Sequence, residues 1–147
     1  TLLAQVDASI GGKNGVNLFG LKNYIGTINE PMEVIADAQV LATLPAHHVL
    51  SGWMEVVKHS LIADANLWSQ LSRYQNIPRP ENQPDLIQAS SQIKRTIVKD
   101  DLYEGGRRKS LNFGHTVAHA LESIGSRQAV NIPHGLTVGL GMVFSLN

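Results

Sequence analysis

The sequence contains no cysteine. Disulfide bonds and thiolate metal sites are therefore excluded, and any bound metal must be held by imidazole and carboxylate groups. The formal net charge is zero, which argues against a nucleic-acid or anionic membrane partner, because both need a basic surface. No apolar run approaches the roughly 20 residues of a membrane-spanning helix, and no signal-peptide pattern begins the chain. These absences predict a soluble cytoplasmic protein.

The 147 residues suffice for one domain of ordinary size with a buried core. The chain begins at Thr1, without Met, directly in front of apolar residues. It stops at Asn147, within an apolar segment that is spaced by glycines. Because both ends look cut, we expect the chain to be a piece of a larger protein.

Two of the six histidines lie in the short apolar stretch from residue 111 to 122. On a helix, His115 and His119 share one face, and Asn112 lies one turn before His115. This spacing lets both imidazoles approach one metal ion, or lets one bind the metal while the other transfers protons. A metalloprotease helix needs Glu after its first His, so Thr116 in that position excludes such a protease. The alternative is a pair of histidines that cap the helix or pack in the core.

The N-terminal segment is rich in glycine and small polar residues. Residues 1–6 are expected to be the end of a strand, followed by a loop over residues 7–17. In this loop Gly11 and Gly12 permit close backbone approach to an anion, and Lys13 supplies positive charge. The spacing is not that of a Walker loop, and a tight surface turn is the alternative.

A second lysine and an amide follow closely, at Lys22 and Asn23. Together with the preceding glycine-lysine loop, they suggest a site for a phosphate or a carboxylate. Residues 31–36 are then predicted to form a short strand that begins with proline. Residues 40–45 are predicted to form a short helical turn that ends at the proline.

From residue 47 to residue 73 the apolar positions recur at helical spacing. Within this segment Glu55, Lys58 and His59 lie three and four residues apart. One interpretation is an ordinary surface ion pair, which contributes little to stability. The other is a carboxylate metal ligand at Glu55 beside a lysine that clamps the substrate.

The remaining segments add further cations and one histidine. A helix is predicted from about residue 84 to 98, with Lys94 beside its apolar stripe as a snorkelling lysine or an anion ligand. Residues 100–108 are predicted to form a charged turn, at the end of which three cations follow one another, at Arg107, Arg108 and Lys109. These cations suit either a solvated face or an anion pocket. His134 precedes a final apolar stretch, as a helix cap or as a third metal ligand.

Several motifs in this chain resemble the 3-dehydroquinate synthase family. In chain order they are Leu-Leu-Ala-Gln-Val-Asp, Gly-Gly-Lys, Lys-Asn-Tyr-Ile-Gly, Met-Glu-Val-Val-Lys, Glu-Gly-Gly-Arg-Arg, Leu-Asn-Phe-Gly-His-Thr and His-Gly. In this family a nucleotide-binding α/β domain precedes a mostly helical metal-binding domain. The resemblance implies a mainly α fold, with residues 1–45 as a strand and loop remnant of the NAD-binding domain. Residues 46–147 are then the helical metal- and substrate-binding domain.

The resemblance also implies the site residues. Zinc, with Co²⁺ as a substitute, is held by Glu55, His115 and His134, and His119 handles protons beside the metal. Substrate contacts are assigned to Lys58, Lys94, Arg108, Asn112 and Asn23. Contacts to NAD or the nearby substrate are assigned to Thr1, Asp7, Lys13, Lys22, Val40, Leu41, Ala42 and Thr43.

The implied reaction converts 3-deoxy-D-arabino-heptulosonate 7-phosphate to 3-dehydroquinate and phosphate, a lyase step of the shikimate pathway. NAD oxidises a hydroxyl that zinc polarises, phosphate is eliminated, the ketone is reduced again, and an aldol step closes the ring. The substrate is thus a small sugar-acid phosphate, and a homodimer is implied for the full-length protein. The isolated chain is expected to be inactive, because the loop that carries the pyrophosphate of NAD is not part of it.

Three positions depart from the family pattern. Leu136 stands where Glu is usual, Ala118 where Gly is common, and Leu102 where an acidic residue is frequent. They weaken the distinction from other sugar-phosphate cyclases, such as 2-deoxy-scyllo-inosose and 2-epi-5-epi-valiolone synthases, which are the first alternative. A polyol dehydrogenase would leave Lys94 and Arg108 without a role. The alternative from a different class is a non-catalytic helical module whose histidines pack or cap.

Overall fold

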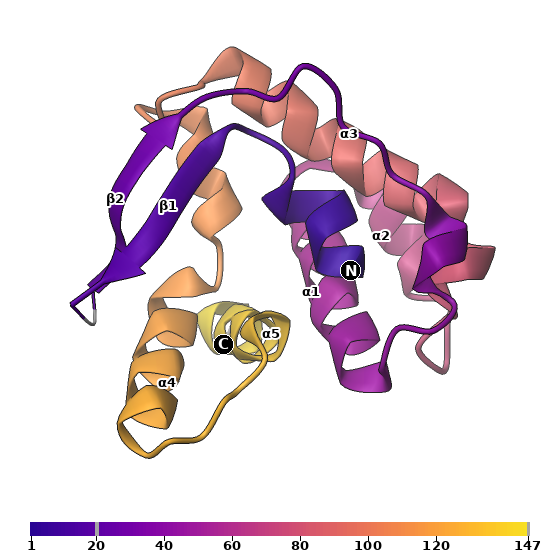
Figure 1. Ribbon diagram of the computed structural model, residues 1–147. Coiled ribbons are helices and arrows are strands. Elements are labelled where there is room, and N and C mark those ends of the chain that lie inside the picture. The colour runs from indigo at the N-terminus through magenta and orange to yellow at the C-terminus, as the bar shows by residue number, and fades with distance from the viewer. Residues whose placement is uncertain (20, 147) are drawn as a thin grey trace.

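The chain folds into a helical body with one β-hairpin at its side (Figure 1). The computed structural model describes residues 1–19 and 21–146, and the side chains of residues 21 and 22 also lie outside the description. In chain order the elements are η1 (Ala4–Ala8), β1 (Lys13–Leu18), β2 (Leu21–Ile28), η2 (Ala38–Leu41), α1 (Ala46–Ala63), α2 (Ala65–Leu71), η3 (Pro80–Asn82), α3 (Pro84–Asp100), η4 (Arg107–Asn112), α4 (His115–Arg127) and α5 (His134–Leu146). The predicted mainly α fold is confirmed. Within the described residues, no helix has both the length and the hydrophobicity needed to cross a bilayer.

Local capping signals set the ends of the long helices. Asp64 separates α1 from α2, because its carboxylate accepts hydrogen bonds from the N–H groups of Asn66 and Leu67 at 2.9 and 3.0 Å. Pro84 opens α3, where its ring suits the first helical turn. The predicted helical segments are thus present, but Asp64 divides the segment from residue 47 to 73 into two helices.

The prediction of a strand at residues 1–6 is wrong. This segment is helical and leads into η1, with Leu2 and Val6 fully buried. Their four-residue spacing fits a helix, and they join the main core beside α1 and α3. The other buried members of that core are Leu41, Val49, Trp53, Val56, Leu67, Leu86 and Ile87. Gly52 of α1 permits the approach, since a Cβ there would lie only 2.5 Å from Leu2 Cγ.

The β-hairpin was not predicted. Residues 7–17 were expected to form a loop, but residues 13–28 contain the antiparallel pair β1 and β2. Gly15 lies opposite Gly26, and a side chain on Gly26 would overlap the backbone of Asn14. At this position glycine therefore permits strand pairing.

Two shorter elements also differ from the prediction. Residues 31–36 pair with no strand in the described part of the chain, so the short strand predicted there is wrong. The predicted helical turn at residues 40–45 begins earlier, as η2. Asp37 caps it by accepting a hydrogen bond from the Gln39 N–H at 2.9 Å.

Gly114 determines where the histidine-bearing helix begins. With a φ of +79°, Gly114 is the N-cap of α4 and makes His115 the first residue of that helix, whereas the helical turn η4 already ends at Asn112. This left-handed conformation suits glycine, which has no Cβ. Asn112 consequently lies outside α4, and the prediction that it shares a helical strip with His115 and His119 is wrong.

The last helix, α5, packs closely on α1 and α4 through glycines. A Cβ on Gly135 would overlap the carbonyl oxygen of Ser51 in α1, and a Cβ on Gly141 would overlap that of Gly114. The N–H of Gly135 also donates a hydrogen bond to Ser51 Oγ at 2.9 Å. This contact fixes the position of His134, the first residue of α5, against α1.

An added methyl group at position 135 tests this packing. Gly135→Ala should lower the free energy of unfolding by about 2–3 kcal/mol, because the backbone of α1 would have to move. Gly139→Ala on the same helix is the control, since its Cβ would meet the flexible side chain of Met54, with Sδ at 2.8 Å. It should cost less than about 1 kcal/mol, because Ala also favours the helix. Urea denaturation measures both, and equal stabilities would contradict the proposed close contact.

Candidate metal and substrate site

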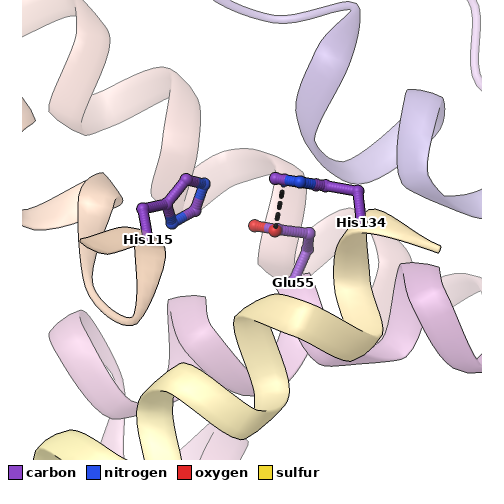
Figure 2. Close-up of side chains that lie close together, drawn as sticks. All are labelled: Glu55, His115 and His134. Carbon is purple, nitrogen blue, oxygen red and sulfur yellow. Dashed lines mark ion pairs between the residues drawn. The ribbon is translucent and has the colours of Figure 1, made fainter. Parts of the chain in front are cut away.

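Three helices bring one carboxylate and two imidazoles together (Figure 2). Glu55 lies within α1, and His115 and His134 are the first residues of α4 and α5. One ligand atom from each residue lies within 4.8 Å of the others, and Glu55 Oε1 is 3.6 Å from His134 Nε2. A set of three such ligands leaves coordination positions open, as catalytic zinc requires. The three predicted metal ligands are thus adjacent in the fold.

The Glu55 carboxylate is fully buried, and its Oε1 has no hydrogen-bond partner among the described residues. Burial raises the pKa of Glu55, and the ammonium group of Lys58, which forms an ion pair with Oε2, opposes this rise. A buried carboxylate oxygen without a partner is energetically costly. A cation between Glu55 and the two histidines would satisfy it, so the donor set fits a divalent metal.

Each of the two histidines has an oxygen atom beside the same ring nitrogen, Nδ1. The Nδ1 atom of His115 lies 3.2 Å from the Phe113 carbonyl oxygen, and that of His134 lies 2.7 Å from a Glu122 carboxylate oxygen. Because these oxygens accept hydrogen bonds, each Nδ1 carries a proton, and Nε2 is then the ring nitrogen that a metal would bind. Burial, reinforced by the charge of Lys58, lowers the pKa of His115 to about 4, so its ring is neutral at pH 7.

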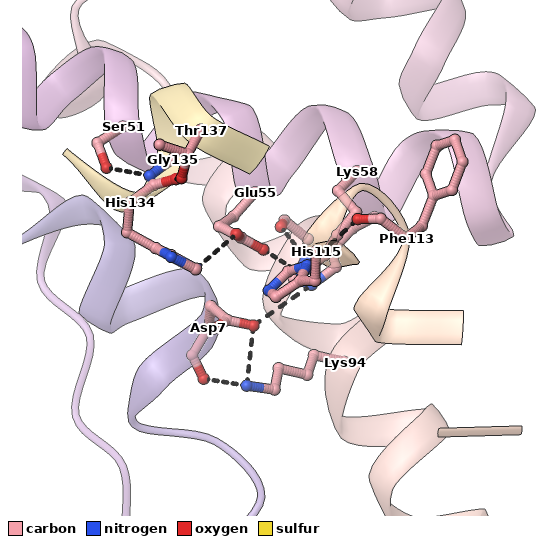
Figure 3. Close-up of polar contacts among 12 residues, drawn as sticks. Asp7, Ser51, Glu55, Lys58, Lys94, Phe113, His115, His134, Gly135 and Thr137 are labelled. Carbon is pink, nitrogen blue, oxygen red and sulfur yellow. Dashed lines mark hydrogen bonds and ion pairs between the residues drawn. The ribbon is translucent and has the colours of Figure 1, made fainter. Parts of the chain in front are cut away.

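A second group of ligand atoms, from Asp7, Glu55 and His59, overlaps the first. Here the Lys94 ammonium lies 2.9 Å from Asp7 Oδ1 and donates a hydrogen bond to the Asp7 carbonyl oxygen (Figure 3). Burial alone raises the pKa of Asp7, but attraction to Lys94 and Lys58 outweighs it and holds this pKa well below its usual value. Because Asp7 Oδ1 is already paired with Lys94, whereas Glu55 Oε1 faces His134 and has no hydrogen-bond partner among the described residues, the first group suits a metal better.

A cavity of about 330 Å³ adjoins the metal ligands. Its lining contains most of the polar residues predicted from the sequence. These residues are Asp7, Lys13, Asn23, Lys58, Lys94, Arg108, Asn112, His115, His119 and His134. The volume lies within the range of small-molecule sites, and the cationic lining suits an anion.

Other residues predicted to bind the cofactor lie elsewhere. The hydroxyl oxygen of Thr1 accepts a hydrogen bond from the Ala4 N–H at 3.2 Å. In residues 40–43, Leu41 is buried in the main core and the other three are exposed. None of these lines the cavity in the described part of the chain. The side chain of Lys22 lies outside the described residues, and the contacts of this set with a cofactor stay predictions.

Partners within the chain hold the cations and amides of the cavity. Glu104 forms an ion pair with Lys13 and accepts a hydrogen bond from the Asn112 amide at 2.6 Å. Burial alone raises the pKa of Glu104, but these two contacts outweigh it and lower the pKa. The buried Arg108 guanidinium donates to two backbone carbonyl groups, including that of Gly11 at 2.8 Å. The N-terminal segment and the loop before η4 are thereby joined at the cavity.

Glu104 and Glu122 have contacts in the site that were not predicted from the sequence. Glu122 follows His115 by seven residues and His119 by three, so helical spacing alone would have placed it on their face. Glu104 lies in a loop at a φ of +60°, and its contacts depend on tertiary structure. Glu122 could therefore have been found from helical periodicity, whereas Glu104 could not.

Asp101 organises the loop that carries Glu104 and Arg108. Its carboxylate accepts hydrogen bonds from the backbone N–H groups of Gly105, Gly106 and Arg108 at 2.8, 2.7 and 2.9 Å. These bonds, first that of Arg108 and then that of Gly106, lower the pKa of Asp101.

Two solved structures are similar to this fold. One is 2-epi-5-epi-valiolone synthase from Streptomyces hygroscopicus with NAD⁺ and Zn²⁺ bound, at a TM-score of 0.81 and 28% identity, over 99% of this chain and 41% of that one. The other is 2-deoxy-scyllo-inosose synthase with carbaglucose-6-phosphate, NAD⁺ and Co²⁺, at a TM-score of 0.79 and 26% identity, over 98% of this chain and 39% of that one. The fold and the site thus define a part of a sugar-phosphate cyclase.

The family follows from the sequence comparisons. The models of the 3-dehydroquinate synthase C-terminal and N-terminal regions match residues 52–147 and 1–51. The chain belongs to the 3-dehydroquinate synthase family. The 3-dehydroquinate synthases of Pyrococcus abyssi and Sulfolobus acidocaldarius are 43% and 45% identical over 97% of this chain. The chain spans 42% and 41% of the length of these two relatives.

The Asp101 contacts give a pH-dependent prediction. Because its pKa is lowered in the folded state, Asp101 stabilises the fold above its ordinary pKa of 3.8, and this contribution is lost as the pH falls through the folded-state value. Asp101→Asn should therefore reduce the stability at pH 7, and its difference from the parent protein should shrink below about pH 4. Urea denaturation at pH 7 and pH 3 measures both.

Asp100→Asn is the matched control for Asp101→Asn. Asp100 forms an exposed ion pair with Arg107 at 3.0 Å, so its loss should change the stability at pH 7 by less than about 1 kcal/mol. Equal effects of the two substitutions would contradict the role of Asp101 in holding the loop.

Proposed function

We propose that this chain is the metal-binding part of a 3-dehydroquinate synthase, which converts 3-deoxy-D-arabino-heptulosonate 7-phosphate to 3-dehydroquinate and phosphate. The observation that carries the proposal is the cluster of Glu55, His115 and His134 beside a cavity lined by cations. The substrate is a polyol acid with a phosphate group. It therefore offers hydroxyl oxygens to a metal and two anionic groups to lysine and arginine.

The proposed metal is zinc, with cobalt as a substitute, held by Glu55, His115 and His134. When bound, zinc polarises a substrate hydroxyl oxygen, and NAD accepts a hydride and later returns it. Zn²⁺ in one similar solved structure and Co²⁺ in another support this choice of metal. The buried Glu55 oxygen without a hydrogen-bond partner supports it independently.

For NAD we propose contacts with Asp7, Lys13 and Lys22, bordered by Thr1 and residues 40–43. Asp7 and Lys13 line the cavity next to the metal ligands, which supports their position beside the reacting part of the substrate. NAD⁺ is present in both similar solved structures, which supports it as the cofactor.

The remaining side chains predicted from the sequence to contact the substrate also have proposed roles. Lys58, Lys94 and Arg108 would bind the carboxylate and phosphate groups of the substrate, and Asn23 and Asn112 its hydroxyl groups. His119 contacts a ligand histidine edge-on, with ring centroids 5.6 Å apart, and would accept and return protons beside the metal. The cavity thus combines anion binding with proton transfer.

The organisation of the longer enzyme is also part of the proposal. Residues 1–45 would be the end of the NAD-binding domain and residues 46–147 a part of the helical domain. The two family models meet after residue 51, near the start of α1, which supports a division in this region. We further propose a cytoplasmic homodimer.

A second candidate function is that of another sugar-phosphate cyclase, and the likeness to the two solved cyclases favours it. Those structures are 28% and 26% identical to this chain, whereas relatives named 3-dehydroquinate synthase are 43% and 45% identical. Phosphate release by the longer protein from 3-deoxy-D-arabino-heptulosonate 7-phosphate, and none from a sugar phosphate without a carboxylate, would support the synthase. The reverse preference would favour the second function.

Zinc binding tests the proposed metal site. The chain should bind one Zn²⁺, and Glu55→Ala, His115→Ala and His134→Ala should each weaken binding by more than about 100-fold, which exceeds the usual effect of residues that only orient ligands. Competition with a chromogenic chelator measures the affinity. His47→Ala, at an exposed histidine, is the control. Zinc binding that survives all three substitutions would refute the ligand assignment.

The isolated 147-residue chain should release no phosphate from the substrate in the presence of NAD⁺ and Zn²⁺. The reason is that the chain spans only about two-fifths of the length of its relatives and contains only part of the proposed NAD site. A colorimetric phosphate assay checks this outcome. Turnover by the chain alone would show that these residues suffice for hydride transfer.

A further inference from the structure

We infer that Glu122 is a positioning residue that fixes the ring of His134 in the tautomer and orientation that metal binding needs. The inference rests on the proposed metal site. Glu122 lies on α4, and its Oε1 is 2.7 Å from His134 Nδ1. The other ring nitrogen of His134 faces Glu55 Oε1 at 3.6 Å. Helix α4 therefore supplies the ligand His115 directly and orients a second ligand on α5.

The contact between Glu122 and His134 determines which ring nitrogen carries the proton. A carboxylate oxygen accepts a hydrogen bond from an N–H, so the pairing favours the tautomer of His134 with its proton on Nδ1. The lone pair then lies on Nε2, towards Glu55. A carboxylate on the far side of a ligand histidine also makes the ring a stronger donor to the metal.

Thr137 holds the Glu122 carboxylate in place. The Thr137 side chain is fully buried, and its hydroxyl lies 3.1 Å from Glu122 Oε1 and 2.6 Å from the His134 carbonyl oxygen. The Glu122 side chain is itself only 10% exposed. The carboxylate is thus fixed against the first turn of α5, and the His134 ring meets it at a defined position.

The two ligand histidines differ in how they are oriented. His115 donates its Nδ1 proton to the backbone carbonyl of Phe113, whereas His134 donates to a side chain. The His134 side chain is 34% exposed, so its ring is less restricted by neighbouring atoms than the ring of a buried histidine would be. The orientation of the His134 ring therefore depends on Glu122, and a substitution of Glu122 can remove this preferred orientation.

Two measurements on Glu122 variants test this inference. Glu122→Leu should weaken zinc binding by about 10–100-fold, and Glu122→Gln should weaken it less, because the amide oxygen still accepts the Nδ1 proton. In the metal-free protein, at a pH at which the histidine rings are neutral, ¹⁵N NMR should show the Nδ1–H tautomer of His134 in the parent protein and in Glu122→Gln. Glu122→Leu should lose this preference. Ser126→Ala, one turn further along α4, is the control.

The outcomes separate this inference from the proposed function. Parent protein that binds zinc, together with Glu122 variants of unchanged affinity and tautomer, would overturn the role of Glu122 alone. A parent protein that binds no zinc would refute both the metal site and the positioning role. If Glu122→Leu does not fold, Glu122→Ala, which also lacks an acceptor for His134 Nδ1, and the absorption spectrum of its Co²⁺ complex decide, since loss of stability alone does not change the spectrum of the folded, saturated site. A spectrum identical to that of the parent protein would contradict the inference.

Discussion

The burial of the Glu55 carboxylate is the constraint on which the site depends. A carboxylate removed from water is stable only beside positive charge or hydrogen-bond donors, and burial raises the pKa of Glu55. The fold surrounds it with the Lys58 ammonium and the ring of His134. Neither contact satisfies Oε1 by a hydrogen bond. A metal between α1, α4 and α5 would therefore stabilise the packing of these helices as well as bind substrate.

Backbone contacts at glycines give this arrangement its dimensions. Gly135 sets α5 directly on the backbone of α1, and Gly141 sets it on the turn at Gly114 that precedes α4. His134 and His115 each lie next to one of these contacts in sequence. Since the two proposed histidine ligands are the first residues of α4 and α5, displacement of either helix would move one of them with it. The metal geometry thus depends on residues that have no side chains of their own.

The long helices could be predicted because they rest on local apolar spacing, and motifs that resemble a known family pointed to Glu55, His115 and His134, which the fold brings together. Prediction from the sequence failed at the segments whose structure depends on distant partners. Residues 1–6 are helical because Leu2 and Val6 pack on α1, and Gly26 serves a hairpin that is visible only from its pairing. The turn at Gly114, which removes Asn112 from α4, depends on a backbone conformation that composition does not reveal.

The charges at the cavity account for the kind of substrate proposed. In the described residues of its lining, Lys13, Lys58, Lys94 and Arg108 are cationic and Asp7 and Glu104 are anionic. When the carboxylate of Glu55, the proposed metal ligand next to the cavity, is counted as well, these side chains carry one positive charge in excess. A bound divalent metal would raise the excess to three. A substrate with one carboxylate and one phosphate carries close to three negative charges at neutral pH. Metal and substrate therefore complete a charge balance that side chains alone leave unequal, so anion binding should depend on prior metal binding.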